Sequence, residues 1–547
     1  MTTYASVGVR RIQTHLARTR SLWGRRGASD QLWDLTQLPE SENGATSADT
    51  AADGHPKPRH HQGHGALVAS VLKEHPGVEV NREALDIDGE VPIQGADTEA
   101  VWQAARQLVR RIQERQPAVE VVIQLWADQP SYAATLARDP EELEEYLPAV
   151  REYPPVRTCD ECQTDGVSDV IGKEAPVGLQ GKSLCRDCFH RTTTGRRKSL
   201  RFATERQRKV LEEGGELVDD PTPWDVAGSR QRPPGLRVEA GLLFALNQDR
   251  EPHLTYLGGF PDLARVPALK RPDGPGGQAD AGEIRRRTYE DNHTALVFAD
   301  ANGLGGIFAA LRRRAADSGE AMKQLKSLSA GLKQATWEAL VSATKQVTGP
   351  GDERLPVIAH LLGGDDLLVS LPATRTWPFV RALMTGLQTE FEKRVYPYVP
   401  DGFTRPSVSA AVVVSRAVFP FGLQVDLSER LLKEAKQYGR GADWMITWQD
   451  VTADGPGSVS RTPWRWSEME DRTAALDHLV QMTGSAVGAL RSDLSQEDLV
   501  GAALKLEHRA ARLAPVRELL KKLQVTDPGA KDVRLLRDLL VLGRWWR

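Results

Sequence analysis

Apolar stretches in the first 150 residues predict two strand–helix pairs. The run from Tyr4 to Val7 is strand-like, and the following residues Val9, Ile12 and Leu16 recur at helical spacing. Three further elements are expected, namely a helix near 98–116, a strand at 119–127 and a helix near 129–146. This alternation predicts a small sheet layer covered by helices.

A second unit with the same alternation runs from about residue 292 to residue 450. A buried strand at 294–300 ends at Asp300, and two apolar half-strands within 360–371 enclose the sequence GGDD. Downstream we expect a helix at about 375–394, a strand at 406–415, a helix ending at 431–436 and a strand near 443–448. The order β-α-β-β-α-β, with GGDD on the central hairpin, is the ferredoxin-like plan of polymerase palms.

The remaining segments differ in composition. Residues 39–65 and 268–282 are rich in Gly, Pro and polar residues, which predicts a mobile insertion and a linker or long surface loop. The apolar run 235–246 predicts a strand. Beyond residue 465 the strand signals stop, and helical spacing predicts a bundle. The positions that carry this spacing are Leu499, Ala503, Leu506, Leu513, Leu520 and Leu523.

Composition sets the class of protein. With 547 residues, 40% hydrophobic and 27% charged, the chain is long enough for about three or four domains with ordinary cores. The net charge of −3 does not require nucleic acid, so any surface for a polyanion must be local. No run of about 18 apolar residues exists, and the N-terminus lacks the apolar core of a secretory signal. We therefore expect a cytoplasmic protein with no membrane partner.

The chain has four cysteines, and they form two C-x-x-C pairs. Cys159 and Cys162 are separated from Cys185 and Cys188 by 22 residues. Two such turns supply the four thiolates of a tetrahedral, structural Zn²⁺ site, which leaves no open position for a substrate. A redox role for one pair is the alternative.

A run of basic residues follows the cysteines. It predicts either a solvated helix face or a surface that contacts RNA phosphates or an acidic subunit. Its members are Arg191, Arg196, Arg197, Lys198, Arg201, Arg206, Arg208 and Lys209.

The candidate chemistry lies in three acids of the second unit. If strand ends bring Asp300 beside Asp365 and Asp366, the carboxylates repel one another unless one or two Mg²⁺ or Mn²⁺ ions bind. Such ions grip a triphosphate and stabilise phosphoryl transfer. An ordinary exposed β-turn at GGDD is the alternative.

Residues expected to contact a nucleotide surround these acids. Backbone amides of a glycine-rich turn at the start of a helix bind phosphates readily. Glycines in the hairpin permit the positive φ of a tight turn. A lysine near a helix end is expected to reach a triphosphate, with a solvated surface lysine as the alternative. These residues are Gly303, Gly305, Gly306, Gly363, Gly364 and Lys436.

Four segments carry a family resemblance. The sequences ADANGLGGIF, GGDD, SVSAAV and LLKEAKQYGR, in this order between residues 299 and 440, resemble the second palm domain of the large subunit of type III CRISPR–Cas effector complexes. That family is related to GGDEF diguanylate cyclases. The N-terminal SVGVRRIQTHLARTRSLWGRRGAS is similar to the opening of the first palm in Cmr-type large subunits.

The resemblance implies an α+β fold of two ferredoxin-like palm domains, an inserted zinc ribbon and a C-terminal helical bundle. The expected divisions are a first palm at 1–150 with the insertion near 39–65, a ribbon and basic segment at 151–230, a connection at 231–290, the second palm at 291–455 and the helical domain at 465–547.

The resemblance also implies an activity. It is that of a metal-dependent nucleotidyltransferase which converts ATP to cyclic oligoadenylates in antiviral defence when target RNA binds. Asp300, Asp365 and Asp366 are the implied catalytic metal ligands. The implied partners are other CRISPR effector subunits, crRNA and target RNA.

The sequence departs from the family pattern in two places. Asn302 stands where the family has a second acid, which is expected to weaken one metal position. No His-Asp dyad precedes the first palm, so no HD nuclease is expected, and the tract of His60, His61 and His64 lacks a neighbouring Asp. A Walker-type phosphate loop is also absent from the sequence, which disfavours a P-loop ATPase.

Two other functions remain open at this point. One is a scaffold subunit whose palm domain has lost catalytic activity. The other is a stand-alone nucleotide cyclase. In the C-terminal bundle, the basic side chains either face solvent or form a docking surface for a small helical subunit or the target strand. These side chains include Arg509, Arg512, Lys521 and Lys522.

Overall fold

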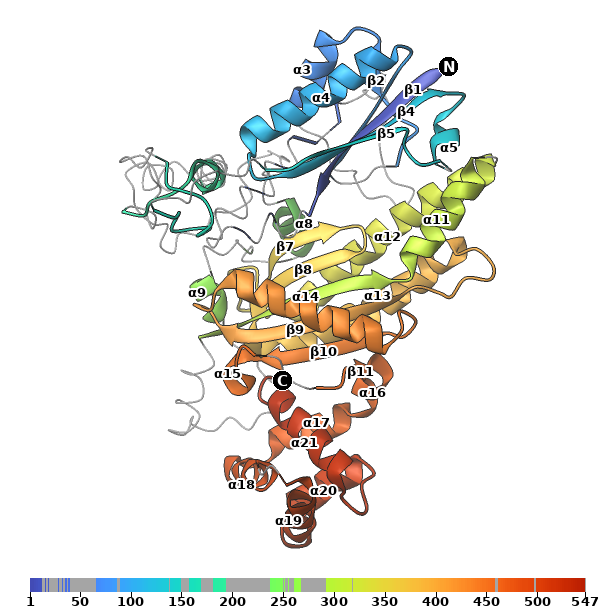
Figure 1. Cartoon of the computed structure of the whole chain (residues 1–547). Coiled ribbons are helices and arrows are strands. Elements are labelled where there is room, and N and C mark those ends of the chain that lie inside the picture. Colours follow the sequence, from blue (N-terminus) through green and yellow to red (C-terminus); the bar gives the residue numbers. More distant parts are fainter. Residues whose placement is uncertain are drawn as a thin grey trace.

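The computed structural model contains two β-sheets and a helical C-terminal end (Figure 1). It describes residues 1–11, 65–85, 89–136, 138–148, 157–168, 181–192, 237–248, 260–266, 292–316, 318–457, 461–495 and 498–546, with single positions between these ranges. The expected insertion at 39–65 lies almost wholly outside the described residues, and so do the His60–His64 tract and the expected linker at 268–282.

The first sheet has five antiparallel strands in the order β2-β3-β1-β4-β5. They are β1 (Thr2–Arg10), β2 (Val78–Val80), β3 (Glu90–Gly95), β4 (Glu120–Gln129) and β5 (Glu142–Tyr146). Helices α3 (Ala66–Glu74) and α4 (Thr98–Arg115) complete this unit. The first four strands have the ferredoxin-like order, with β5 added at the edge, as the fold prediction requires.

Helix α4 forms where the 98–116 prediction placed it. The side chain of Asp97 caps its N-terminus by accepting a hydrogen bond from the Glu99 amide. Buried residues at three- and four-residue spacing, including Val101, Leu108 and Ile112, face the sheet and join one hydrophobic core with it.

Two predictions in this unit are wrong. The expected helix near 129–146 is a single turn, α5 (Tyr132–Thr135), followed by the edge strand β5. The glutamates of β5 favour a helix in isolation, but pairing with β4 and ion pairs to Arg10 and Arg106 hold the segment extended. Val9, expected on a helix, belongs to β1, and Ile12 and Leu16 lie outside the described residues.

The second sheet has six strands in the order β11-β10-β9-β6-β8-β7. They are β6 (His293–Asn302), β7 (Ile358–Gly363), β8 (Asp366–Pro372), β9 (Ser407–Arg416), β10 (Met445–Asp450) and β11 (Trp464–Arg465). The strands β9, β6, β8 and β7 are antiparallel neighbours, and β10 joins β9 in parallel. The predicted β-α-β-β-α-β plan is confirmed, with β10 and β11 extending the sheet.

Helices cover both faces of this sheet. They are α11 (Leu304–Ala315), α12 (Gly319–Gln346), α13 (Thr376–Arg394) and α14 (Phe421–Tyr438), and Figure 1 shows α14 across one face. Val297 and Ala299 of β6 join the core formed with α12 and α13, whereas Leu296 and Phe298 pack with α14. Because side chains alternate along a strand, Asp300 points to the same face as Leu296 and Phe298.

The apolar run 235–246 is a helix, α8 (Arg237–Leu246), and not the predicted strand. A short continuous apolar run has no period that separates the two states. Here Leu242 and Leu243 pack into the core of the second sheet, and Gly241 lies against the ring of Trp337 on α12. A side chain at position 241 would collide with that ring, since an added Cβ would stand 2.6 Å from it. The remaining short helix of this region is α9 (Phe260–Ala264).

The C-terminal region is helical, as predicted. Its helices are α15 (Val451–Asp454), α16 (Trp466–Asp471), α17 (Thr473–Gln481), α18 (Gly484–Leu494), α19 (Leu499–Arg512), α20 (Ala514–Lys522) and α21 (Ala530–Gly543). Ala503, Leu506 and Leu520 are buried at the predicted spacing. Arg509, one of the basic residues expected to face solvent or a partner, pairs with Asp493. No helix among the described residues is both long and apolar enough to cross a membrane.

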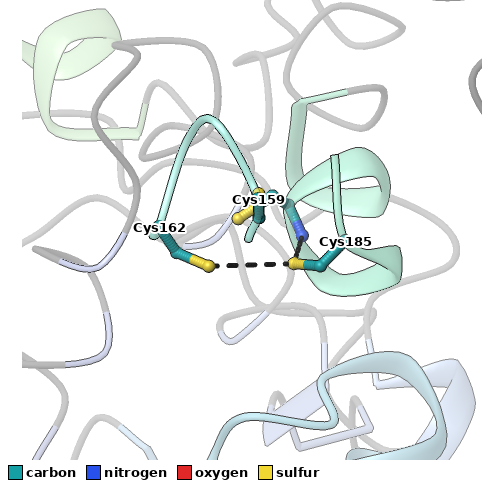
Figure 2. A group of neighbouring side chains, drawn as sticks. Cys159, Cys162 and Cys185 are labelled. Atoms are coloured by element: carbon teal, nitrogen blue, oxygen red, sulfur yellow. Dashed lines mark hydrogen bonds between the residues drawn. The ribbon is translucent and has the colours of Figure 1, made fainter. Parts of the chain in front are cut away.

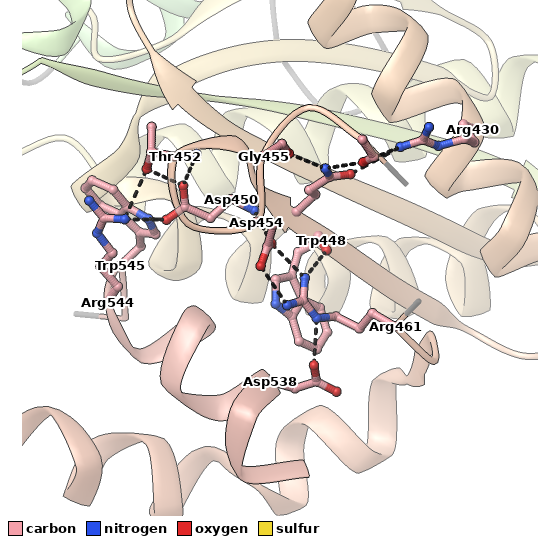
Figure 3. Close-up of polar contacts among 12 residues, drawn as sticks. Arg430, Trp448, Asp450, Thr452, Asp454, Gly455, Arg461, Asp538, Arg544 and Trp545 are labelled. Carbon is pink, nitrogen blue, oxygen red and sulfur yellow. Dashed lines mark hydrogen bonds and ion pairs between the residues drawn. The ribbon is translucent and has the colours of Figure 1, made fainter. Parts of the chain in front are cut away.

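A buried polar network joins this bundle to the second sheet (Figure 3). The carboxylate of Asp450, at the end of β10, accepts hydrogen bonds from Trp545 Nε1 at 2.8 Å and Arg544 Nη1 at 3.0 Å. Nearby, Arg461 donates to Asp538 on α21 at 2.7 Å and to the Trp448 carbonyl at 2.9 Å. These bonds fix the C-terminal helices against the end of β10.

We expect Asp450→Ala to destabilise the protein by about 2–4 kcal/mol, because it removes the acceptor of the buried Trp545 N–H and the carboxylate that pairs with the Arg544 cation. Urea unfolding of the full chain, followed by tryptophan fluorescence, measures the change. Glu320→Ala removes only an exposed ion pair with Lys323 and should cost less than about 1 kcal/mol. Equal losses in both variants would contradict the anchoring role of Asp450.

Candidate nucleotide site and thiolate cluster

The GGDD hairpin is a two-residue turn between β7 and β8. Gly363 pairs with Asp366, which leaves Gly364 and Asp365 as the loop. Gly364 has φ of +60°, the left-handed conformation that glycine adopts at the first loop position of a type II′ hairpin. Thr336 of α12 donates a hydrogen bond to the Gly364 carbonyl at 2.9 Å and holds the turn in place.

The structure brings Asp300 and Asp365 within electrostatic reach of one another. Burial raises the pKa of the Asp365 carboxyl, and the negative charge of Asp300 raises it further. Burial also raises the pKa of Asp300, although Lys436 acts in the opposite direction. Asp366 begins β8 and points to the same sheet face as Leu368, which is the face of Asp300. Asp300 thus lies close enough to Asp365 for its charge to affect that carboxyl, and Asp366 adjoins Asp365 in the chain.

Lys436 lies in the last turn of α14 and forms an ion pair with the carboxylate of Asp300. The side chains are 31% and 22% exposed, so the pair is open to solvent on one side. The residue expected to contact a triphosphate therefore neutralises an acid when no nucleotide is bound. The Lys436 ammonium group also lies near both carboxylates. An anionic ligand bound there would compete with the carboxylates for this ammonium group.

The three acids do not converge as tightly as a closed metal site. Among the residues that the structure describes, the cysteines are the only group of three or more potential ligands whose atoms lie within 4.8 Å of one another. The chemistry of the acid pair nevertheless suits a hard divalent cation, because carboxylate oxygens are its preferred ligands and the pair is raised in energy without one.

Asn302 lies two residues beyond Asp300, but its side chain is engaged in other hydrogen bonds. Its side chain is only 4% exposed, and its amide donates to Ser407 Oγ at 2.9 Å and to Ser409 Oγ at 3.0 Å. Ser407 in turn donates to the Asp443 carbonyl at 3.0 Å. The amide thus ties the end of β6 to β9 and fixes the strand that carries Asp300. The alternation Ser-Val-Ser in β9 was the sequence signal for this cluster, and sequence analysis missed it.

The glycine turn after β6 opens helix α11. Gly303 has φ of +79° and is the N-cap residue, without a side-chain hydrogen bond to the first amides. Gly305 and Gly306 are exposed, and a Cβ added to Gly305 would meet no atom within 4 Å. The first-turn amides are therefore accessible on a helix of 12 residues, an arrangement that attracts phosphate.

The four cysteines are brought together as predicted, and Figure 2 shows three of them converging. All four Sγ atoms lie within 4.8 Å of one another, and Cys162 Sγ is 3.9 Å from Cys185 Sγ. A tetrahedral Zn²⁺ with bonds of about 2.3 Å separates its sulfur ligands by about 3.8 Å. Backbone amides point at the sulfur atoms, including the Cys188 amide at 3.4 Å from Cys185 Sγ. The donor set fits a structural zinc ion.

The four thiols also affect one another's protonation. Hydrogen bonding to the other sulfur atoms lowers the pKa of the Cys162 thiol and raises the pKa of Cys185 and of Cys188. The cluster alone therefore retains protons that a divalent metal would displace.

Arg191 is not part of a solvated or RNA-facing surface, so that prediction is wrong for this residue. It is fully buried, pairs with Asp187 and donates to the His15 carbonyl at 2.7 Å. Burial, and then the charge of Arg191, lower the pKa of His15 to about 3, which keeps the imidazole neutral. The first basic residue after the cysteines thus anchors the thiolate cluster to the N-terminal segment. The other members of the basic run lie outside the described residues.

Comparison with known proteins identifies the second sheet. Residues 293–443 match the family described as Cas10/Cmr2, second palm domain. No curated protein matches the chain. Solved structures are similar to it at 12% identity. A Csm1-Csm4 cassette in complex with cA4 has a TM-score of 0.47, covering 100% of this chain and 70% of that chain. A cassette in complex with AMPPNP scores 0.44 with the same coverage. Csm1 in T. onnurineus scores 0.46, covering 100% and 69%.

The topology of β6 to β9, with an acid at the end of the central strand and another in the neighbouring hairpin, defines a palm of the polymerase and cyclase class. Within that class, residues 293–443 are similar to the second palm domain of Cas10/Cmr2. The predicted resemblance of this segment to the second palm domain of the family is confirmed by the match.

Replacement of Cys185 by Ser is expected to abolish zinc retention. The purified chain should carry about one equivalent of zinc, and the variant close to none, because one thiolate of a tetrahedral set is lost. Metal analysis by mass spectrometry after gel filtration measures both. Thr164→Ala, an exposed change in the same turn region, should retain the metal. Zinc-free wild-type protein would contradict the assignment.

Asp365→Asn is expected to stabilise the metal-free chain by about 0.5–1 kcal/mol near pH 7.5, because it removes a buried charge that faces Asp300. A raised pKa means that the folded state holds this proton more tightly than the unfolded chain. The wild type therefore regains stability relative to the variant as pH falls and Asp365 takes up a proton. The stability advantage of Asp365→Asn should shrink toward about pH 4. Urea unfolding in EDTA at several pH values measures the effect, with exposed Asp527→Asn as control. A variant less stable than wild type at neutral pH would contradict the repulsion.

Proposed function

We propose that this chain is the large subunit of a type III CRISPR RNA-guided effector complex, and that its second palm converts ATP to cyclic oligoadenylates when target RNA binds. The match of residues 293–443 to the Cas10/Cmr2 second palm supports the family role. The observation that carries the activity is the electrostatic proximity of Asp300 and Asp365, together with an exposed glycine turn that follows β6 and starts α11. Acids, an open helix N-terminus and a nearby lysine are the parts that nucleotidyl transfer needs.

Each part has a role in the proposed reaction. The amides of the Gly303–Gly306 turn bind phosphate oxygens, and Gly363 and Gly364 let the hairpin lie close to the nucleotide. Asp300, Asp365 and Asp366 hold Mg²⁺ or Mn²⁺, which supplies charge stabilisation to the transferring phosphoryl group when bound. Lys436 leaves Asp300 and contacts the triphosphate instead, so that the positive charge follows the incoming negative charge.

The reaction that fits these parts is attack of a ribose hydroxyl of one nucleotide on the α-phosphate of the next, with release of pyrophosphate. Repetition and closure produce a ring. Solved Csm1-Csm4 structures carry cA4, cA3 and AMPPNP, and these are the ligands to test first with this chain. The proposed partners are crRNA, target RNA and neighbouring effector subunits, and the proposed structural metal of the thiolate cluster is Zn²⁺.

Asp365→Ala with Asp366→Ala is expected to reduce oligoadenylate synthesis by at least about 100-fold, because both hairpin ligands for the cation are lost. The assembled complex is incubated with ATP, Mg²⁺ and matching RNA, and products are separated by chromatography. Assembly and RNA binding should be unchanged, since both residues lie in a half-exposed turn. Persistent oligoadenylate synthesis by the double variant would contradict the assignment of the metal site to this hairpin.

A scaffold without turnover is the second candidate, and two observations favour it. Lys436 already neutralises Asp300, and the amide of Asn302 is engaged by Ser407 and Ser409 where the family has an acid. The same incubation separates the two, because a scaffold binds RNA and assembles but yields no oligoadenylate. A stand-alone cyclase would instead be active as the isolated chain without guide RNA.

A further inference from the structure

Two exposed aromatic side chains are candidates for contacts at the proposed nucleotide site. Among the residues that the structure describes, Phe403 and Tyr438 are the only Phe, Tyr or Trp side chains that are exposed, at 40% and 55%. Tyr438 ends α14, two residues after Lys436. Phe403 lies in the loop between α13 and β9, a part of the chain to which neither the sequence analysis nor the proposed reaction gives a role.

Phe403 lies at the first turn of α11. Its Cε1 atom is 3.8 Å from the place where a Cβ on Gly306 would stand, which is van der Waals contact. Because Gly306 has no side chain, the ring approaches the same turn whose amides are accessible to phosphate. The carbonyl oxygen of Gly441 also lies near this turn, 3.8 Å from the Cβ position of Gly303.

The loop that carries Phe403 is held at both ends. The Phe403 amide donates to the Pro400 carbonyl at 3.2 Å, and Gly402 adopts φ of +85° within that turn. Tyr396 donates its hydroxyl to the Pro406 carbonyl at 3.2 Å, and Arg405 lies over the Tyr396 ring at 5.0 Å. A fixed loop therefore presents the ring to solvent, although burying it in the neighbouring core would gain free energy.

We propose that Phe403 is the stacking face for the base of the nucleotide whose phosphates bind the Gly303–Gly306 turn. An aromatic ring stacks on any base, and more strongly on a purine because of the larger shared area. This inference rests on the proposed function and adds to it the residue that holds the base. It makes Phe403 a binding residue that acts independently of the acids and of Lys436.

The test compares two ligands on the full chain in the presence of Mg²⁺. One is the α,β-methylene analogue of ATP, which binds without transferring its nucleotidyl group, and the other is inorganic tripolyphosphate, which has no base. Calorimetric titration gives the Kd of each for wild type, Phe403→Ala and Phe403→Trp. Leu504→Ala, which removes an exposed apolar side chain of the C-terminal bundle, is the control.

The two ligands distinguish the contribution of the base to binding from that of the phosphates. Phe403→Ala should weaken the ATP analogue by about 5- to 100-fold and leave tripolyphosphate within about twofold, whereas Phe403→Trp and the control should bind both as wild type does. Unchanged binding of the ATP analogue by Phe403→Ala would overturn the inference. An equal loss of both ligands would also overturn it, because Phe403 would then be shaping the phosphate turn. Wild-type protein that binds neither ligand would overturn the proposed function itself.

Discussion

Repulsion between two half-buried carboxylates is the constraint around which the second palm is arranged. Asp300 ends the central strand, Asp365 occupies the tip of the adjacent hairpin, and each is shielded from the water that would otherwise screen its charge. A fold does not place two acids this way for stability, because separated or neutral side chains would cost less. Lys436 relieves part of the repulsion, and its position on the end of α14 makes the relief reversible. This arrangement is consistent with the proposed binding of a cation together with an anionic ligand.

The surrounding structure keeps this unfavourable pair in place. Thr336 holds the carbonyl of the hairpin turn from the side of α12, and Asn302 binds β6 to β9 just beyond Asp300. Strands β6 and β9 are buried on both faces, which fixes the backbone that carries Asp300. The Asn302 contacts also give a physical reason for an amide at this position, since a carboxylate could not donate to two serine hydroxyls.

Two features distant from the acids stabilise the rest of the chain. The network of Asp450, Arg544 and Trp545 connects the C-terminal helices to the edge of the second sheet (Figure 3). The thiolate cluster is connected to the N-terminal segment through buried Arg191. Both use charged groups in the interior, where a missing partner costs more than the intact pair contributes. They hold separate parts of the sequence in contact but supply no group to the proposed reaction.

The sequence by itself determined the elements whose patterns are long or chemically specific. Strands β6 to β10 of the second palm, its helices α13 and α14, the GGDD hairpin, the paired cysteines and the helical C-terminus could be predicted from spacing, whereas the long helix α12 was not predicted. It did not determine the state of short runs such as 235–246 and 129–146, because their apolar or glutamate-rich residues suit a helix and a strand almost equally. Only tertiary structure decided that Lys436 meets Asp300, that Arg191 is buried and that Phe403 faces the glycine turn. Those contacts join residues far apart in the chain, and their energies depend on which neighbours the folded sheet brings to each side chain.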